Sequence, residues 1–374
     1  MSSLLDRLLP EPSFVVRDPE AVTRDLVRMY EDATGLTLYP AQVERIMVDI
    51  IAYRESLQRE AIQDAAKLNL VRYSRAPVLD FLGENIGVPR LEAAAAVTTL
   101  RFTFDPVPAV PTLLPAGTQV DGGSVSFTTS EDAVVPAGAG SVDVAASCTA
   151  AGVVGNGFVP GQIKTLAAAV PGLSVAAVQN TTTTADGAEE EDDENFRERI
   201  VLAPGQFSTA GSIAAYRFFA RSAHQTIKDV AVVRPVPGEI ALYPLVETGL
   251  PSAAIKDAVA AACSAERVRP LCDTVGVHDP VQVDWRIEAQ LVLYAGTTPA
   301  VALAEATKAA NAYVATRKPK LGLDTVRTQV IDVLSVYGVY RVDLIEPAAD
   351  QVLSAEKWAN CTDVAITIAD VVEG

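Results

Sequence analysis

The sequence predicts a multidomain α+β protein with an N-terminal helical region, a small all-β, sandwich-like domain and two small α/β open-sandwich units. Apolar residues recur at helical spacing near the N-terminus, alternate along short segments in the next stretch, and then follow strand-like and helix-like patterns in turn. A chain of 374 residues is long enough to build all four parts. We expect the parts to span residues 1–95, 96–184, 185–278 and 279–374.

Two helices are expected in the N-terminal region. Asp18 and Pro19 suit the start of the first helix, and Gly35 suits its end. The second is expected over residues 43–68, where apolar residues recur at steps of three and four.

The apolar face of the second helix has two interpretations. It packs against the first helix of the same chain, or it meets helices of other subunits in a bundle. For the second interpretation the candidate interface residues are Ile46, Ile50, Tyr53 and Leu57.

The stretch from Val97 to Asn180 carries few charged residues and should be all-β. Apolar residues occupy every second position in Leu100–Phe104 and Ser141–Val144, which places them on one face of a strand. Proline and glycine pairs mark turns between the segments. These patterns predict a small sandwich or barrel-like domain.

Residues 186–199 form an acidic run with eight carboxylates and two arginines. A helix from residue 193 to 202 would place several of the acids at a helix N-terminus, where negative charge is favoured. The run lacks the alternation of ligands that a calcium loop requires, so we expect a solvated charged loop leading into this helix.

The last two parts should alternate strands and helices. In the first unit we expect helices over 210–222 and 252–267, and strands over 229–234 and 239–246. In the second we expect strands over 281–294, 339–345 and 364–368, and helices over 299–318 and 323–336. Both patterns indicate small open α/β sandwiches of related layout.

Composition and motifs disfavour several classes of function. The formal net charge of −17 repels phosphate backbones and anionic membrane surfaces, so neither a nucleic-acid partner nor membrane insertion is expected. His224 and His278 are far apart in sequence, and no phosphate-binding, zinc-protease or nucleophile-elbow motif occurs. We therefore predict no enzyme, and no catalytic, cofactor-binding or metal-binding residues. The four cysteines lack metal-site spacing and are expected to be buried free thiols.

Several ordered stretches together resemble the baseplate J-like proteins of contractile-tailed bacteriophages and related contractile injection systems. They are Leu79–Gly83, Leu114–Val120 with Phe127–Thr129, Gly152–Asn156, and the acidic run leading into Glu194–Ile200. The first 35 and last 28 residues match no motif of the family.

The resemblance implies a structural subunit of a tail baseplate wedge, located in the virion and assembled in the host cytoplasm. Its implied partners are other copies of itself, present as two conformers per wedge in a sixfold ring, smaller wedge proteins, and hub and sheath-proximal proteins. The implied work is to transmit the conformational change that triggers sheath contraction. The alternative is a tail fibre or receptor-binding structural protein, although such proteins usually show a sequence repeat or a trimeric coiled coil.

Overall fold

The computed structural model describes residues 9–208, 211–266, 268–270 and 272–373 of the chain. The chain divides into two compact units, one made of Met1–Arg90 and Asp192–Val201, the other of Leu91–Glu191 and Leu202–Gly374. The chain therefore leaves the first unit after Arg90 and returns to it about a hundred residues later, at Asp192. This division is coarser than the four parts expected from the sequence, whose boundaries stay a prediction.

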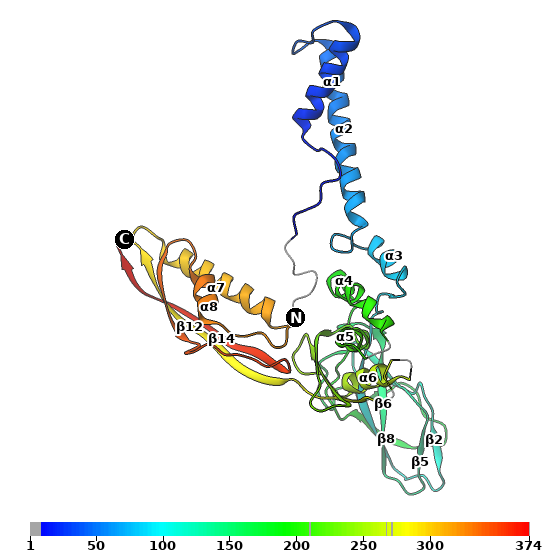
Figure 1. Cartoon of the computed structure of the whole chain (residues 1–374). Coiled ribbons are helices and arrows are strands. Elements are labelled where there is room, and N and C mark those ends of the chain that lie inside the picture. Colours follow the sequence, from blue (N-terminus) through cyan, green and yellow to red (C-terminus); the bar gives the residue numbers. More distant parts are fainter. Residues whose placement is uncertain (1–8, 209–210, 267, 271, 374) are drawn as a thin grey trace. The chain divides into compact units, whose positions relative to one another are not determined.

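The first unit is helical. In Figure 1 its first two helices lie side by side, with the N-terminal segment running along the second. Its helices are α1 (Pro19–Thr34), α2 (Val43–Leu68), α3 (Val78–Glu84) and α4 (Asp193–Leu202). The expected ends of α1 are confirmed, because Asp18 accepts a hydrogen bond from the backbone N–H of Glu20 at 3.0 Å and Gly35 takes the left-handed conformation with φ 71°. The ranges expected for α2 and α4 are confirmed as well.

The second unit begins with the all-β domain. Its strands are β1 (Ala95–Phe104), β2 (Thr112–Leu114), β3 (Gln119–Asp121), β4 (Ser126–Thr129), β5 (Ala133–Val135), β6 (Ser141–Ala151), β7 (Thr165–Leu166) and β8 (Val175–Asn180). Six of them form one sheet in the order β7-β3-β4-β6-β1-β8, which nearly closes into a barrel, while β2 and β5 pair as a separate ribbon. The all-β domain expected from the sequence is confirmed.

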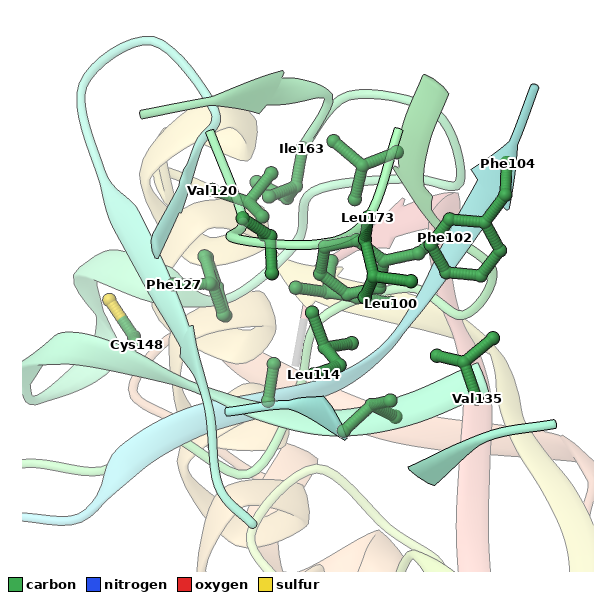
Figure 2. Packing of buried hydrophobic residues seen from close by; sticks show 14 of the residues in the cluster. Leu100, Phe102, Phe104, Leu114, Val120, Phe127, Val135, Cys148, Ile163 and Leu173 are labelled. Atoms are coloured by element: carbon green, nitrogen blue, oxygen red, sulfur yellow. The ribbon is translucent and has the colours of Figure 1, made fainter. Parts of the chain in front are cut away.

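Alternation along β1 explains how the barrel is filled. Leu100, Phe102 and Phe104 are buried, whereas the residues between them point outward. Figure 2 shows these side chains meeting residues from the other strands and loops, such as Val120 and Ile163, in one apolar interior. Burial of these large side chains is the main force that stabilises the domain.

The middle domain consists of α5 (Ile213–Arg221), β9 (Ile227–Val233), β10 (Glu239–Val246), α6 (Ala253–Ser264) and β11 (Thr274–Val277). Its sheet has the order β11-β10-β9, in which β10 pairs antiparallel with β9 and parallel with β11. The strands and helices expected here are confirmed to within a few residues, and the expected helix ends Ala210 and Arg267 lie outside the described residues.

The C-terminal domain consists of β12 (Val281–Tyr294), α7 (Pro299–Arg317), α8 (Arg327–Leu334), β13 (Val339–Glu346) and β14 (Lys357–Val372). Its sheet has the order β13-β12-β14, and α7 and α8 pack over it (Figure 1). The central strand β12 again has one antiparallel and one parallel neighbour, β13 and β14. Two open α/β sandwiches are thus confirmed, although their strands are connected in a different order.

Two elements of the C-terminal domain differ in length from the sequence expectation. Helix α8 starts later than expected, because Thr325 exchanges backbone hydrogen bonds with Gln351 instead of entering the helix. Strand β14 is much longer than the expected strand 364–368, because it pairs with β12 along the whole length of that strand. Polar residues near the start of β14 interrupt the alternation of apolar residues, so the sequence pattern did not indicate this pairing.

The four cysteines differ in their exposure. Cys148 and Cys263 are buried free thiols as expected, whereas Cys272 is exposed and Cys361 is partly exposed, so the expectation is wrong for these two. Within the described residues, no helix has both the length and the apolar character that crossing a membrane would require.

Candidate assembly interface

The candidate interface residues share one face of α2. Ile46, Ile50, Tyr53 and Leu57 are 51%, 58%, 65% and 47% exposed. Their spacing of four, three and four residues keeps them within one side of the helix, since each residue turns the helix by about 100°. The interpretation in which this face packs against α1 is therefore wrong for this chain.

More exposed apolar side chains lie beside this face. Val43 and Met47 adjoin it, whereas Ile51 and Ile62 extend the apolar surface farther around the helix; all four are more than half exposed. Exposed apolar residues scattered singly need no explanation, but a contiguous strip of this length is typical of an interaction surface.

The opposite face of α2 is already covered. Val48, Ala52 and Gln63 are 7%, 2% and 2% exposed, and α1 packs against α2. On a helical wheel these three residues lie about 120° to 180° from Ile50 and Leu57. A helix with apolar residues on two opposite faces belongs in the interior of a bundle, and this chain supplies a cover for one face.

The N-terminal segment covers the second half of α2 through polar contacts. The Gln63 side-chain amide accepts from the backbone N–H of Phe14 at 2.8 Å and donates to the carbonyl of Pro12 at 2.6 Å. Arg59 donates to the carbonyl of Val16 at 3.1 Å, and Lys67 pairs with Glu11 at 2.9 Å. These contacts tie residues 11–16 to the second half of α2.

The part of the acidic run from Asp192 onward belongs to the helical unit, which the sequence did not suggest. Asp193, at the start of α4, accepts a hydrogen bond from Arg90 at 2.7 Å, and Arg90 also pairs with Asp80 of α3 at 2.7 Å. Burial tends to raise the pKa of Asp193, but the hydrogen bonds from Arg90 and from the Ala76 backbone N–H outweigh it and hold the pKa below its ordinary 3.8.

Side chains of α4 complete this junction. Phe196 is fully buried, and the Arg90 guanidinium stacks over its ring at 4.7 Å. Arg197 donates to the carbonyls of Val71 and Ser74 at 2.9 Å and 2.7 Å. Glu191 lies in the loop before α4 and is buried, so the expectation of a solvated charged loop is wrong at this residue. Arg197 and Arg199 of α4 are buried as well. The mixture of aromatic and arginine residues within the run was the signal that could have indicated this.

Groups with catalytic or metal-binding chemistry are dispersed among the described residues. Within them, no cluster of three or more histidine, cysteine or acidic side chains could hold a metal ion. The half-buried His224 contacts the hydroxyl of Thr226 at 2.7 Å through Nδ1, and His278 lies against the ring of Tyr243. Both contacts hold local structure, and nothing in them aligns a nucleophile with a base.

Comparison with known proteins agrees with the domain order. Three family models match in sequence: the Baseplate J-like protein barrel domain over residues 99–187, the Baseplate J-like central domain over 208–278, and the Baseplate J-like protein C-terminal domain over 285–367. The fold and these matches define a structural protein built of three baseplate-type domains. The chain belongs to the baseplate J-like family. The helical region that carries α2 precedes the three matched ranges.

The chain is also similar to individual known proteins. Baseplate protein J of Escherichia phage P2 is 33% identical over 193 residues, which are 51% of this chain and 64% of the relative, so the match spans less than two thirds of that protein. The cryo-EM structure of the anti-feeding prophage baseplate, 6-fold symmetrised, is 11% identical with a TM-score of 0.41, covering 91% of this chain and 90% of that chain.

Proposed function

We propose that the chain is a structural subunit of a tail baseplate wedge. It assembles with copies of itself and with smaller wedge proteins around the hub of a contractile tail, and it performs no catalysis. Membership of the baseplate J-like family supports the class of assembly. The observation that carries the proposal for this chain is the exposed strip on α2, since apolar surface of this extent is stable in water only when another surface covers it.

The strip of Ile46, Ile50, Tyr53 and Leu57 is the proposed contact with helices of other subunits. The a/d-like spacing of these four residues suits packing into the grooves of parallel or antiparallel helices. Because α1 and the N-terminal segment hold the other side of α2, the strip is presented by a helix that is already fixed in position within its unit. Fixed presentation lowers the entropy lost when the partner helices bind.

The proposed subunit transmits a change of shape to trigger sheath contraction. It occurs in two conformers per wedge within a sixfold ring. The barrel, middle and C-terminal domains each have a separate apolar core, which suits a change of shape in which whole domains move. A domain with its own core can move as a body while its interior packing is kept.

The proposal is tested with a double variant of the strip, Ile50→Ser with Tyr53→Ser. The full chain is mixed with the small baseplate proteins of the same particle, and the mass of the complex is measured by light scattering. The wild-type chain should form a stable complex, whereas the double variant should keep its thermal unfolding temperature and lose the complex.

A matched control keeps the test specific. Val352→Ser changes an apolar residue that is 80% exposed in the C-terminal domain, and it should leave complex formation unchanged. Unchanged assembly of the double variant would contradict the proposed contact. Binding of the purified chain to whole host cells, without any complex with baseplate proteins, would favour a receptor-binding protein instead.

A further inference from the structure

Strand β14 lies at the edge of the C-terminal sheet. It is 16 residues long and pairs in parallel with β12, and within the described residues it is the last strand in the order β13-β12-β14. An edge strand leaves every second backbone N–H and C=O without a strand partner, so a long edge is a template for pairing with another chain.

The middle of β14 is the regular part of this edge. The pairing with β12 shifts at Thr362 and again at Ala369, so residues 363–368 form an uninterrupted run between two irregularities. At the start of the run, the backbone N–H of Val364 donates to the Asp363 carboxylate at 2.9 Å. This N–H points away from β12, and because backbone groups alternate along a strand, those of Ile366 and Ile368 point away from β12 too.

Carboxylates protect the ends of the edge but not its centre. Asp370 accepts from the backbone N–H of Val371 at 2.8 Å, as Asp363 does for Val364. Between these two residues the sequence is Val364-Ala-Ile-Thr-Ile-Ala369, which has no charge and no proline and has high β propensity. Natural edge strands usually carry a lysine, a proline or an inward charge at such a place.

The exposed centre is complementary to itself. Residues 365–369 read Ala-Ile-Thr-Ile-Ala in both directions. In an antiparallel pair centred on Thr367, Ile366 faces Ile368 of the second copy and exchanges both backbone hydrogen bonds with it. The flanking acids then face valines, since Asp363 lies opposite Val371 and Asp370 opposite Val364, so no like charges are opposed.

Burial favours the same arrangement. Ile366 and Ile368 are only partly buried at the margin of the core beneath α7, while Ala365 and Thr367 are exposed on the other face. In the centred pair the isoleucines of both copies lie on the helix side of one continuous sheet and cover each other. The same patch serves both copies, as a twofold interface requires.

We infer that the β14 edges of two copies of this chain pair antiparallel about Thr367, joining their C-terminal sheets. The inference goes beyond the contact proposed for α2 and rests on the proposed function only in that copies of the chain assemble with one another. We assign a second copy of the chain as the pairing partner, because residues 365–369 have the same sequence in both directions and therefore match themselves in an antiparallel pair.

The test is a cross-link at the symmetry axis. Thr367→Cys is made in the full chain with Cys272→Ser and Cys361→Ser, which remove the two accessible thiols. In the proposed pairing, position 367 faces itself in a pair that exchanges no backbone hydrogen bonds. The Cα atoms of such a pair are about 4.5 Å apart, a distance that a disulfide can span. Mild oxidation should convert most of the chain to a disulfide-linked dimer.

Ala365→Cys is the matched control, since it is equally exposed on the same face. Its two symmetric copies would be separated by four residues along the strands, about 13 Å, which is too far for a disulfide. No dimer is expected with this variant. Equal cross-linking by both variants, or none by Thr367→Cys at concentrations where the wild-type chain self-associates, would overturn the inference.

A charge substitution gives a second and independent readout. Thr367→Lys places two ammonium groups against each other at the axis and should abolish self-association through this edge, measured by sedimentation velocity. Gln290→Lys adds the same charge to the same face of the neighbouring strand β12 and should leave self-association intact. Both variants should keep the wild-type unfolding temperature, and loss of association with Gln290→Lys alone would contradict the pairing.

The two proposals fail separately. Thr367→Cys combined with Ile50→Ser and Tyr53→Ser should still cross-link while losing the complex with small baseplate proteins. A cross-link formed only with a different protein would show that the edge has another occupant and would overturn the pairing of two copies.

Discussion

At the scale of single residues, the packing of α4 against the segment between α2 and α3 depends on the buried Arg197. Arg197 satisfies two backbone carbonyls, those of Val71 and Ser74, and its side chain is 9% exposed. A buried carbonyl that loses its donor costs free energy, because water cannot replace the donor.

We predict that Arg197→Met destabilises the helical unit by about 3 kcal/mol, because two carbonyls would remain buried without a partner. Urea unfolding followed by circular dichroism measures this loss. The control is Glu194→Gln, which changes the 83% exposed partner of Arg197 and should cost far less. Equal effects of the two variants would show that the surface ion pair matters more than the carbonyl contacts.

In the acidic run, the start of α4 was predictable from the sequence, but the burial of its arginines was not. Charge repulsion correctly predicted a helix beginning at Asp193. It could not predict that Arg197 and Arg199 are buried, because their partners are backbone carbonyls of residues more than a hundred positions earlier in the chain. A backbone acceptor leaves no mark in the sequence.

His224 gives the fold a dependence on pH. Burial lowers the pKa of His224 below its ordinary 6.5, against the opposing effect of Asp186. Between the lowered pKa and 6.5 the unfolded chain binds more protons than the folded chain, so the free energy of unfolding should decrease as the pH falls through this window. The carboxyl of Asp193, whose pKa lies below 3.8, titrates in a lower range.

We predict that His224→Gln flattens this dependence. Urea unfolding between about pH 7 and about pH 5 measures it, because an unfolded histidine gains its proton there. Thr226→Val keeps the imidazole and should keep most of the wild-type slope. An identical slope in His224→Gln would mean that other groups carry the pH dependence.

At the scale of elements, α2 was predicted with its correct ends because its apolar residues recur over 26 positions. Periodicity alone could not tell which of its faces the same chain would cover, since both carry apolar residues. Covering one face also depends on Gln63, a polar residue that the pattern would assign to the surface.

We predict that Gln63→Leu releases the N-terminal segment from α2. The substitution removes both hydrogen bonds to the segment, a loss of about 2 kcal/mol that leaves the helix itself folded. Hydrogen exchange at the Phe14 amide should become much faster. Gln58→Leu, at an exposed position of the same helix, should leave that exchange unchanged, and unaltered protection of Phe14 in Gln63→Leu would refute the role of the amide.

At the scale of the whole molecule, small apolar contacts join domains that have their own cores. Trp358 of β14 is 4% exposed and packs in a cluster with Ala231 and Leu245 of the middle domain and with Leu321. Its indole N–H donates to the carbonyl of Lys318 at 2.8 Å. This cluster links the middle and C-terminal domains within the second unit.

We predict that Trp358→Ala uncouples the unfolding of the two domains. Loss of a buried tryptophan costs about 3 to 5 kcal/mol, and here most of that loss should fall on the contact between the domains. Differential scanning calorimetry should show one transition dividing into two. Tyr337→Ala removes an aromatic side chain that is 99% exposed and should preserve the wild-type profile; a single transition in Trp358→Ala would argue against coupling through this cluster.

The order of domains was predictable from the sequence, because each domain has its own pattern of apolar residues. The return of the chain to the helical unit at Asp192 was not predictable from the sequence, because it depends on contacts between α4 and residues 71–90. Local patterns report which elements form, and only the folded chain shows which of them share a unit.

The central claim is that the exposed strip of α2 is covered by other subunits in an assembled baseplate. A cryo-EM map of the purified particle, with side chains of this chain resolved, tests it most directly. We expect Ile46, Ile50, Tyr53 and Leu57 to contact helices of neighbouring subunits in this map. A map in which this strip faces solvent in every copy of the chain would contradict it.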